Sequence, residues 1–433
     1  MNNLKSKYIG YAFLATTVAF TSACNKEYLN PNAATAEDVL TSAKGLTGVT
    51  VGLQKNFSTT RAGVLYASIT LNGLTTNELI SINTGNTNEE RLVAGGVQVD
   101  GTNTILLNVW AGSNKIIFDA DNVINNATNL PDKNYASGLI AHASIFKALA
   151  LGNLSEYWER VPASIGQNVS FISRVEGFNK AIATIDNALA VIAANPISSS
   201  FSGNIPAGID IPNTLNALKA RYALFAGNYA LALTAANAVD LSLSKKSTFT
   251  YDALNLNPIF EIATSTNNVI QPKNISLGQT GANVPDAGDA RIPFYTVVNT
   301  TVRINGFGAG TFTQIPVYLP GEITLIKAEA YARQATPNLS SSLTELNKIV
   351  TKTAATDAFG VGANLPALTG TYTQQQLLDL IYKHRCIELF MSGLKLEDMR
   401  RFNQPLTDRK RNFFPYPFQE RDNNSNTPAD PAF

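Results

Sequence analysis

The sequence predicts a mainly α-helical fold of tetratricopeptide-like hairpins, interrupted by one loop-rich portion with minor β-structure. Three observations predict it. Apolar residues recur every three or four positions over long stretches, as on the buried stripe of a helix. Pairs of these stretches are joined by short turns of Gly, Asn or Pro, as in helical repeats. One interval, residues 245–320, loses the helical period and is rich in Pro and Gly instead.

The composition is that of a folded protein with an unusually uncharged surface. Of the 433 residues, 45% are hydrophobic and only 15% charged, which excludes a disordered chain. The formal net charge is +1, and no basic stripe runs along the sequence. We therefore expect no nucleic-acid partner, and a neutral ligand such as a carbohydrate fits better than a polyanion.

The N-terminus is typical of a secretory leader. Lys5 and Lys7 precede an uncharged apolar run over residues 8–20, which is shorter than the ~20 residues that span a bilayer. Small residues then lead to Cys24, an arrangement that resembles a bacterial lipobox with Thr21 where many have Leu. We expect a lipoprotein signal peptide over residues 1–23, lipidation at Cys24, a tether over 24–36 and one domain over 37–433. A plain secretory leader with an incidental cysteine is the alternative.

Helical spacing predicts N-terminal helices over residues 37–54, 61–79 and 106–125, with Thr35 as the first cap. Residues 81–104 differ, because Gly, Asn, Thr and Glu dominate there and no aromatic residue occurs. We predict a long surface loop, a kind of segment that is often functional. Arg91 in this loop is a candidate ligand-binding residue, although the loop offers no ring for sugar stacking.

Helical repeats are predicted at about 135–240 and 321–403. The strongest periodic helices cover residues 135–158 and 173–194. Residues 212–240 form the clearest hairpin, because a turn at Gly227 separates two apolar-periodic stretches. Ala232 and Ala236 would let its helices approach closely. A similar pair begins at residue 321. A single hairpin cannot bury its apolar stripe, whereas stacked hairpins can.

The loop-rich insert over about 245–320 is predicted to hold the ligand. Runs such as residues 297–304 alternate like short strands. Aromatic rings and amides suit neutral polar ligands and are concentrated between Pro285 and Pro320. The alternative is that the aromatic residues there only seal the core. The candidate ligand-binding residues of the insert are Phe294, Tyr295, Asn305, Phe307, Phe312 and Tyr318.

Motifs in the C-terminal third resemble the SusD/RagB family, and further segments at 109–124, 146–162 and 288–293 extend the resemblance upstream. The resemblance rests on LPGEITLIKAEAYAR (319–333), HRCIELFMSGLKLEDMRRF (384–402) and FPYPFQERDNN (414–424). It implies a SusD-like fold and a lipid-anchored outer-membrane protein that faces the cell exterior. Such a protein would capture an oligosaccharide and deliver it to a SusC-like TonB-dependent transporter. A peptide-binding uptake receptor is the alternative within the family, and a surface lipoprotein glycoside hydrolase is the alternative outside it.

The family motif supplies four residues that we interpret as structural. Arg385 and Glu388 lie three apart on the apolar stripe of a predicted helix and are expected to form a buried pair. Asp398 and Arg401 belong to the same motif. No catalytic constellation is visible, so we expect no enzyme and no cofactor. Neither histidine has a cysteine at metal-ligand spacing, so we expect no metal site.

Overall fold

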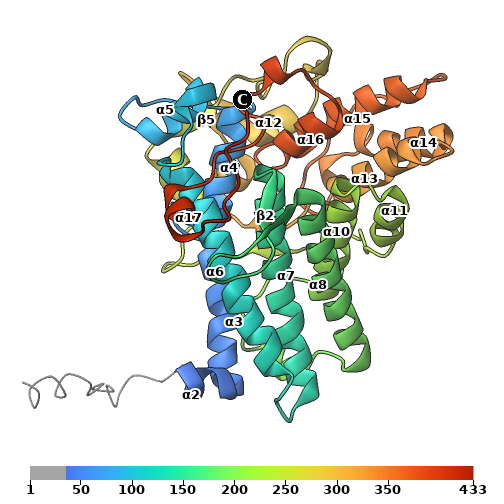
Figure 1. The fold of residues 1–433 in the computed structure, drawn as a ribbon. Coiled ribbons are helices and arrows are strands. Elements are labelled where there is room, and N and C mark those ends of the chain that lie inside the picture. The colour runs from blue at the N-terminus through green and yellow to red at the C-terminus, as the bar shows by residue number, and fades with distance from the viewer. Residues whose placement is uncertain (1–35, 433) are drawn as a thin grey trace, which may run out of the picture.

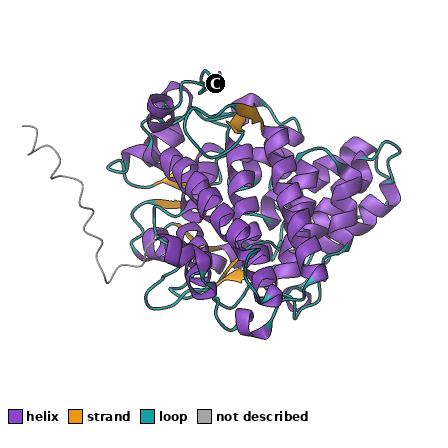
Figure 2. Ribbon diagram, turned by 60° about the horizontal axis from the view of Figure 1, so that its bottom comes forward, coloured by secondary structure: helices purple, strands orange, loops and turns teal. Residues whose placement is uncertain are grey.

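The computed structural model describes residues 36–432, which fold into a mainly helical protein with a few short strands at the margins (Figure 2). This confirms the predicted fold class. The leader, Cys24 and the tether up to residue 35 lie outside the described residues. In Figure 1 the helical hairpins fill the middle and one side, while the loop-rich insert and the segment around α5 share the upper end.

The N-terminal helices largely follow the predicted pattern, with two differences. The helix expected over 37–54 is two helices, because Ser42 leaves the helix and its Oγ accepts from the Gly45 amide at 3.1 Å. The expected loop over 81–104 contains a helix that the pattern missed, in which only Leu92 and Glu89 are buried. The elements are α2 (Ala36–Thr41), α3 (Ala43–Ser58), α4 (Val64–Thr75), α5 (Thr87–Ala94), η1 (Gly96–Gln98) and α6 (Thr104–Ala127).

The predicted repeats are present as antiparallel helices. Ser173 begins α8 with a capping box to Glu176, and Gly227 joins α10 to α11 with a φ of 77°, which glycine adopts without strain. Ala232 and Ala236 are fully buried, as close packing requires. The helices are α7 (Lys133–Tyr157), α8 (Arg174–Ala194), α9 (Ser199–Ser202), α10 (Ile211–Phe225), α11 (Tyr229–Asn237), α13 (Pro320–Arg333), α14 (Leu339–Val350), α15 (Gln374–Glu388), α16 (Lys395–Arg401) and α17 (Phe418–Asn423).

The insert consists of short pairings and single turns, as predicted. Each strand pair is antiparallel, and residues 296–304 form the hairpin that their alternation indicated. The pairs are β1 (Leu79–Ser81) with β5 (Ile270–Pro272), β2 (Arg160–Pro162) with β3 (Phe171–Ser173), β4 (Thr248–Phe249) with β8 (Ile315–Pro316), and β6 (Thr296–Val298) with β7 (Val302–Ile304). The short helical turns are η2 (Phe260–Ser265), η3 (Gly281–Asn283), α12 (Arg291–Tyr295), η4 (Gly306–Gly308), η5 (Ala354–Thr356) and η6 (Leu406–Asp408).

The core has a large and a small part. The large cluster runs from α3 through α11 and continues beneath the insert, so the insert closes over the helices rather than folding apart from them. The small cluster lies between α13, α14, α15 and α16. The β1–β5 pair ties the insert to the N-terminal helices, which brings loops far apart in sequence to the same end of the molecule.

Candidate ligand-binding cavity

A cavity lies between the helices and the insert, with about 950 Å³ of empty space including its mouth. Helices α3, α4, α7, α10 and α13 line one side, and the insert lines the other through Phe249, Ile259, Tyr295 and residues between 305 and 319. The turn between α15 and α16 contributes the remainder. Apart from Asn153, the lining residues that keep some solvent exposure belong to the insert and to this turn, so the cavity is nearest to solvent there.

The turn between α15 and α16 has a shape that the local sequence explains. Met391 and Gly393 both adopt positive φ, at 60° and 84°. The Gly393 carbonyl accepts hydrogen bonds from Tyr157 Oη at 2.8 Å and from Asn72 Nδ2 at 2.5 Å. These bonds from α7 and α4 hold the turn against the helices, so it forms a fixed wall of the cavity.

The helices place polar groups in the cavity that the protein itself does not satisfy. Asn153 Nδ2 and Glu156 Oε2, both on α7, have no hydrogen-bond partner among residues 36–432. Buried polar atoms in folded proteins nearly always have a partner, and leaving one unsatisfied costs free energy. Both atoms are therefore available to a polar molecule inside the cavity.

Burial governs the charge of the cavity. It raises the pKa of Glu156 to about 8, although Arg221 beside it acts in the opposite direction. Glu156 is therefore largely protonated at neutral pH and offers both a donor and an acceptor. Arg221 pairs in bidentate fashion with Glu322, at 2.6 and 2.7 Å, so these two charges offset each other. The lining is mostly apolar with a few polar groups and is close to neutral, which suits an uncharged ligand.

Four of the seven predicted ligand-binding residues line this cavity: Tyr295, Asn305, Phe307 and Tyr318. Phe307 and Asn305 keep some exposure, whereas Tyr295 is buried and its hydroxyl donates to the Glu388 carbonyl at 2.5 Å. The aromatic ring of Tyr295, and not its hydroxyl, is therefore available to contact a ligand in the cavity.

The other three predicted residues lie elsewhere. Phe294 packs edge-on against Phe307 behind the cavity wall, with ring centroids 5.3 Å apart. Phe312 is 56% exposed and is not part of the lining. Arg91 lies on α5, where it contacts Thr102 at 3.1 Å. Only part of the predicted cluster therefore converges on one space.

Helical periodicity gives no indication of the polar residues that the helices contribute to the cavity. The insert was predicted to hold the ligand, yet Asn153, Glu156, Arg221 and Glu322 of the helices also line the cavity. A signal was present in the sequence, because Glu156 and Arg221 interrupt strongly apolar helices. Charged residues on an apolar stripe mark a buried ion pair or a site.

The expected Arg385–Glu388 pair is wrong, although both residues are buried. Arg385 Nε donates to Asp398 Oδ2 on α16 at 2.9 Å, and Asp398 also accepts from Arg401 at 2.5 Å. Glu388 instead pairs with Arg291 of α12 at 3.1 Å and with Lys352. Each residue pairs with a side chain of another element instead of the residue three positions away. The spacing of residues along one helix cannot predict such contacts between elements.

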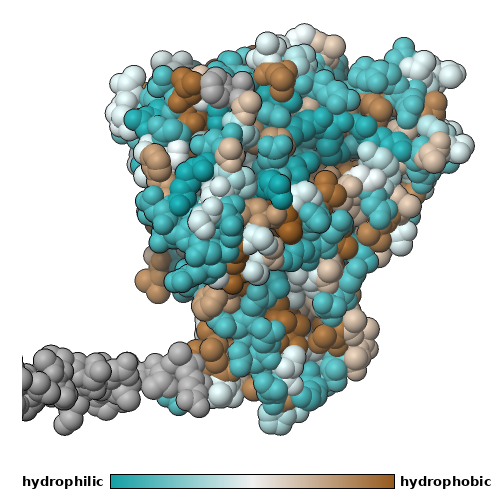
Figure 3. Space-filling model, viewed as in Figure 1, coloured by the Kyte–Doolittle hydropathy of each residue, from teal (hydrophilic) through white to brown (hydrophobic). Residues whose placement is uncertain are grey.

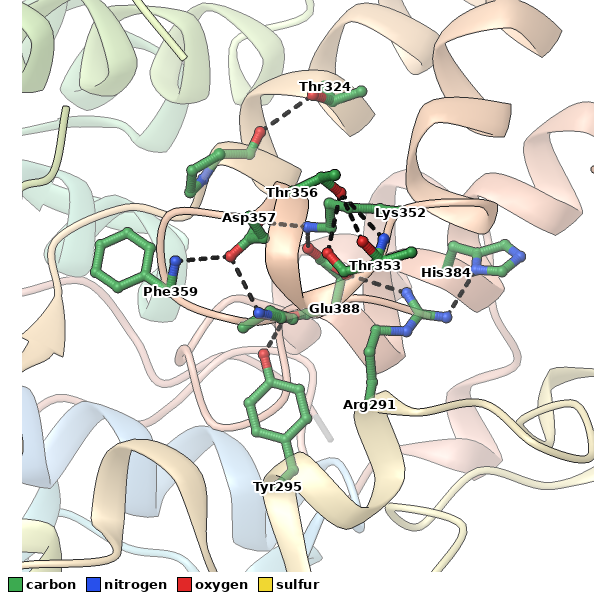
Figure 4. Close-up of polar contacts among 12 residues, drawn as sticks. Arg291, Tyr295, Thr324, Lys352, Thr353, Thr356, Asp357, Phe359, His384 and Glu388 are labelled. Carbon is green, nitrogen blue, oxygen red and sulfur yellow. Dashed lines mark hydrogen bonds and ion pairs between the residues drawn. The ribbon is translucent and has the colours of Figure 1, made fainter. Parts of the chain in front are cut away.

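The Glu388 cluster joins the insert to the C-terminal helices (Figure 4). Arg291 also pairs with Asp289 at 2.7 Å, and its Nη2 donates to His384 Nδ1 at 2.9 Å. Burial, together with Arg291, lowers the pKa of His384 well below its usual value, which keeps the ring neutral and able to accept. Lys352 completes the cluster through Asp357 at 2.7 Å. This network fixes α12, and with it Tyr295 at the cavity wall.

The closing motif is also structural. Glu420 accepts from Trp110 Nε1 at 3.1 Å and from Asn424 Nδ2 at 2.9 Å, so α17 is fastened to α6.

Between residues 36 and 432 no three His, Cys, Asp or Glu side chains are grouped so that they could hold a metal ion. Over the same residues, none of the helices has the length and apolar character needed to cross a bilayer.

Solved structures share this fold. No protein-family model matches the sequence, and no curated protein matches it. A SusD superfamily protein from Parabacteroides distasonis superposes with a TM-score of 0.68 and 15% identity, over 93% of this chain and 100% of the other. A SusD superfamily protein from Bacteroides vulgatus gives 0.65 and 13%, over 90% and 99%. A SusD-like carbohydrate-binding protein from Bacteroides fragilis gives 0.64 and 14%, over 84% and 87%.

Proposed function

Because this chain has the SusD fold, we propose that it is a non-enzymatic receptor that binds an oligosaccharide in the cavity between its helices and its insert. The observation that carries the proposal is the pairing of unsatisfied polar groups with aromatic rings in one nearly neutral space. Sugars need both, because their hydroxyls form hydrogen bonds and their C–H faces stack on rings. The carbohydrate-binding protein of the same fold supports this ligand class.

Different lining residues would contact different parts of a bound sugar. Phe307 is half-buried and can offer its ring to a sugar that enters from the side of the insert. Asn305 offers free carbonyl capacity, since its amide nitrogen already donates to the Pro293 carbonyl at 3.1 Å. Deeper in the cavity, Asn153 and protonated Glu156 would bind hydroxyl groups.

Calorimetry on single variants tests this placement. Phe307→Ala and Asn305→Ala should each weaken the binding of a cognate oligosaccharide, by about tenfold for loss of the ring or of a hydrogen bond. Phe312→Ala is the matched control, because this exposed ring of the same insert lies outside the cavity. Unchanged affinity in both folded cavity variants would place the site elsewhere.

We further propose that the protein is held on the outer membrane by lipid at Cys24, faces the cell exterior and delivers its ligand to a SusC-like TonB-dependent transporter. The leader sequence and the resemblance to the SusD/RagB family support this. Several acyl chains at one cysteine anchor a protein stably without a spanning helix. Cys24→Ser should release the protein from membranes. A variant that stays in the membrane fraction after a high-salt wash, in cells without the transporter, would contradict the anchor.

A surface glycoside hydrolase is the second candidate, because one observation favours it. Glu156 and Glu322 line the same cavity, one largely protonated and the other paired with Arg221. In glycosidases the acid and the nucleophile are likewise two carboxyl groups, and their surroundings keep one protonated and the other ionised. Both Glu322 oxygens, however, are bound by Arg221, which leaves the carboxylate poorly placed to attack. Release of reducing sugar by the wild type, abolished in Glu156→Gln, would favour the hydrolase over the receptor.

A further inference from the structure

A second hollow lies on the opposite side of the helical layer from the insert. Helices α6 and α8 both pack against α7, and the space between them forms a groove of about 1150 Å³ including its open side. Lys147 and Leu151 of α7 form its floor, and the connection between β2 and β3 closes one end through Ile165. Figure 3 shows this face, where apolar and polar side chains lie among one another over α6, α7 and α8.

The groove carries an excess of positive charge. Lys147 Nζ lies 2.5 Å from Asp121 Oδ1, so these two charges offset each other. Lys180 donates to the Ala163 carbonyl, and no acidic side chain among residues 36–432 lies within ion-pair distance of it. Partial burial, together with Lys147, lowers the pKa of Lys180. Asp121 acts on Lys180 in the opposite direction but forms its ion pair with Lys147, so an anionic group beside Lys180 would supply the ion-pair partner that this ammonium group lacks among residues 36–432.

The walls offer the groups that bind sugars. The Phe118 ring is 52% exposed on α6. The side-chain amides of Asn122 on α6 and Asn187 on α8 make no hydrogen bond to any described residue and line the groove. The flat Phe118 ring can stack on the C–H face of a sugar, and the amides beside it can bond the sugar hydroxyls. An extended peptide would fit this arrangement less well.

The groove is long enough for more than one sugar unit. A neighbouring hollow shares Asn114, Pro162, Ser164 and Ile165 with it and continues along α6 to Gln419 and Glu420 of α17, adding about 680 Å³. The acidic Glu420 lies in this second hollow, outside the groove that holds Lys180. The two hollows together form one track over the surface.

We infer that this groove is a second saccharide site, and that it takes a sugar bearing a carboxylate, such as a uronic acid. The carboxylate would lie beside Lys180, and the ring would lie against Phe118. The inference goes beyond the proposed function, because the nearly neutral cavity and the cationic groove suit different sugars and can be tested apart.

Calorimetry with a galacturonic acid trimer, alongside its fully methyl-esterified form, tests the inference. The acid should bind the wild type and the neutral ester should bind at least about tenfold more weakly, since a charge-assisted bond is lost. Lys180→Gln and Phe118→Ala should each weaken binding of the acid, and added NaCl should weaken it in the wild type. Lys115→Gln is the matched control, because this lysine of α6 is 62% exposed and lies outside the groove.

Several results would overturn the inference: no binding of the acid, equal binding of the ester, or unchanged binding in both groove variants. Tighter binding of a tetraglutamate peptide than of the trimer would assign the groove to acidic peptides instead. Glu156→Gln should leave binding of the trimer unchanged, which separates this site from the cavity. Loss of trimer binding in Glu156→Gln alone would place the acid in the cavity and refute the groove.

Discussion

Glu156 links the cavity to the pH dependence of stability. Its pKa is about 8 in the folded protein, raised by burial from 4.5, so the folded state retains a proton that the unfolded chain loses. Neutral Glu156 makes its full contribution to the free energy of unfolding below about pH 4.5. This contribution is lost as pH rises towards 8, at up to about 1.4 kcal/mol per pH unit.

Glu156→Gln should therefore flatten the fall in the free energy of unfolding between pH 5 and pH 8, as followed by urea denaturation at about four pH values. Glu78, whose pKa burial raises to about 7, remains in the variant and keeps part of the slope. Glu261→Gln is the control, because this carboxylate of η2 is exposed. Equal pH slopes for Glu156→Gln and wild type would show that Glu156 is ionised in the folded protein.

Arg385 is predicted to be structural. It is fully buried and pairs with Asp398, so Arg385→Ala leaves Asp398 with one cationic partner fewer and should cost about 3 kcal/mol of stability. Arg91→Ala, which removes a largely exposed guanidinium, should cost under about 1 kcal/mol. Denaturant unfolding measures both. Lost ligand binding at unchanged stability in Arg385→Ala would identify a site residue instead.

At the scale of elements, the start of α13 depends on a close approach to α15. A Cβ at Gly321 would lie 1.9 Å from Glu388 Oε1, and that carboxylate is held in place by Arg291 and Lys352. Gly321→Ala should therefore destabilise the protein by about 1–3 kcal/mol through overpacking.

A second glycine provides the comparison. Gly48 lies inside α3, and a Cβ there would meet no atom within 4 Å. Gly48→Ala should stabilise the protein by about 0.5–1 kcal/mol, because alanine loses less backbone entropy in a helix. Equal effects of the two substitutions in thermal unfolding would refute the close contact between α13 and α15.

Helices with a wide apolar stripe could be predicted from the sequence, and helices held by single contacts could not. The bounds of α7, α8 and α10 agree with their periodicity to within about two residues, the usual uncertainty of helix ends. Helix α5 was missed because Leu92 is its one fully buried apolar residue and polar contacts such as the Glu89–Arg61 ion pair hold the rest, so no apolar periodicity arises. The predicted Arg385–Glu388 ion pair was wrong for a related reason, because each of these residues pairs with a residue of another element.

At the scale of the whole molecule, the cavity is a joint product of the helices and the insert. The sequence directed attention to aromatic residues of the insert, and Tyr295, Phe307 and Tyr318 do line it. Asn153, Glu156, Arg221 and Glu322 come instead from α7, α10 and α13, and the way these helices stack cannot be read from the pattern of any one of them. Composition gives no hint of the cationic groove, because two lysines do not alter a net charge near zero.

The central claim is that this protein binds an oligosaccharide. A glycan array probed with the soluble form lacking residues 1–24, beside a peptide library as comparison, tests it most directly. We predict retention of at least one oligosaccharide, with binding abolished or strongly reduced when Phe307 is replaced by alanine. Retention of peptides and of no glycan, by a protein shown to be folded, would contradict the account.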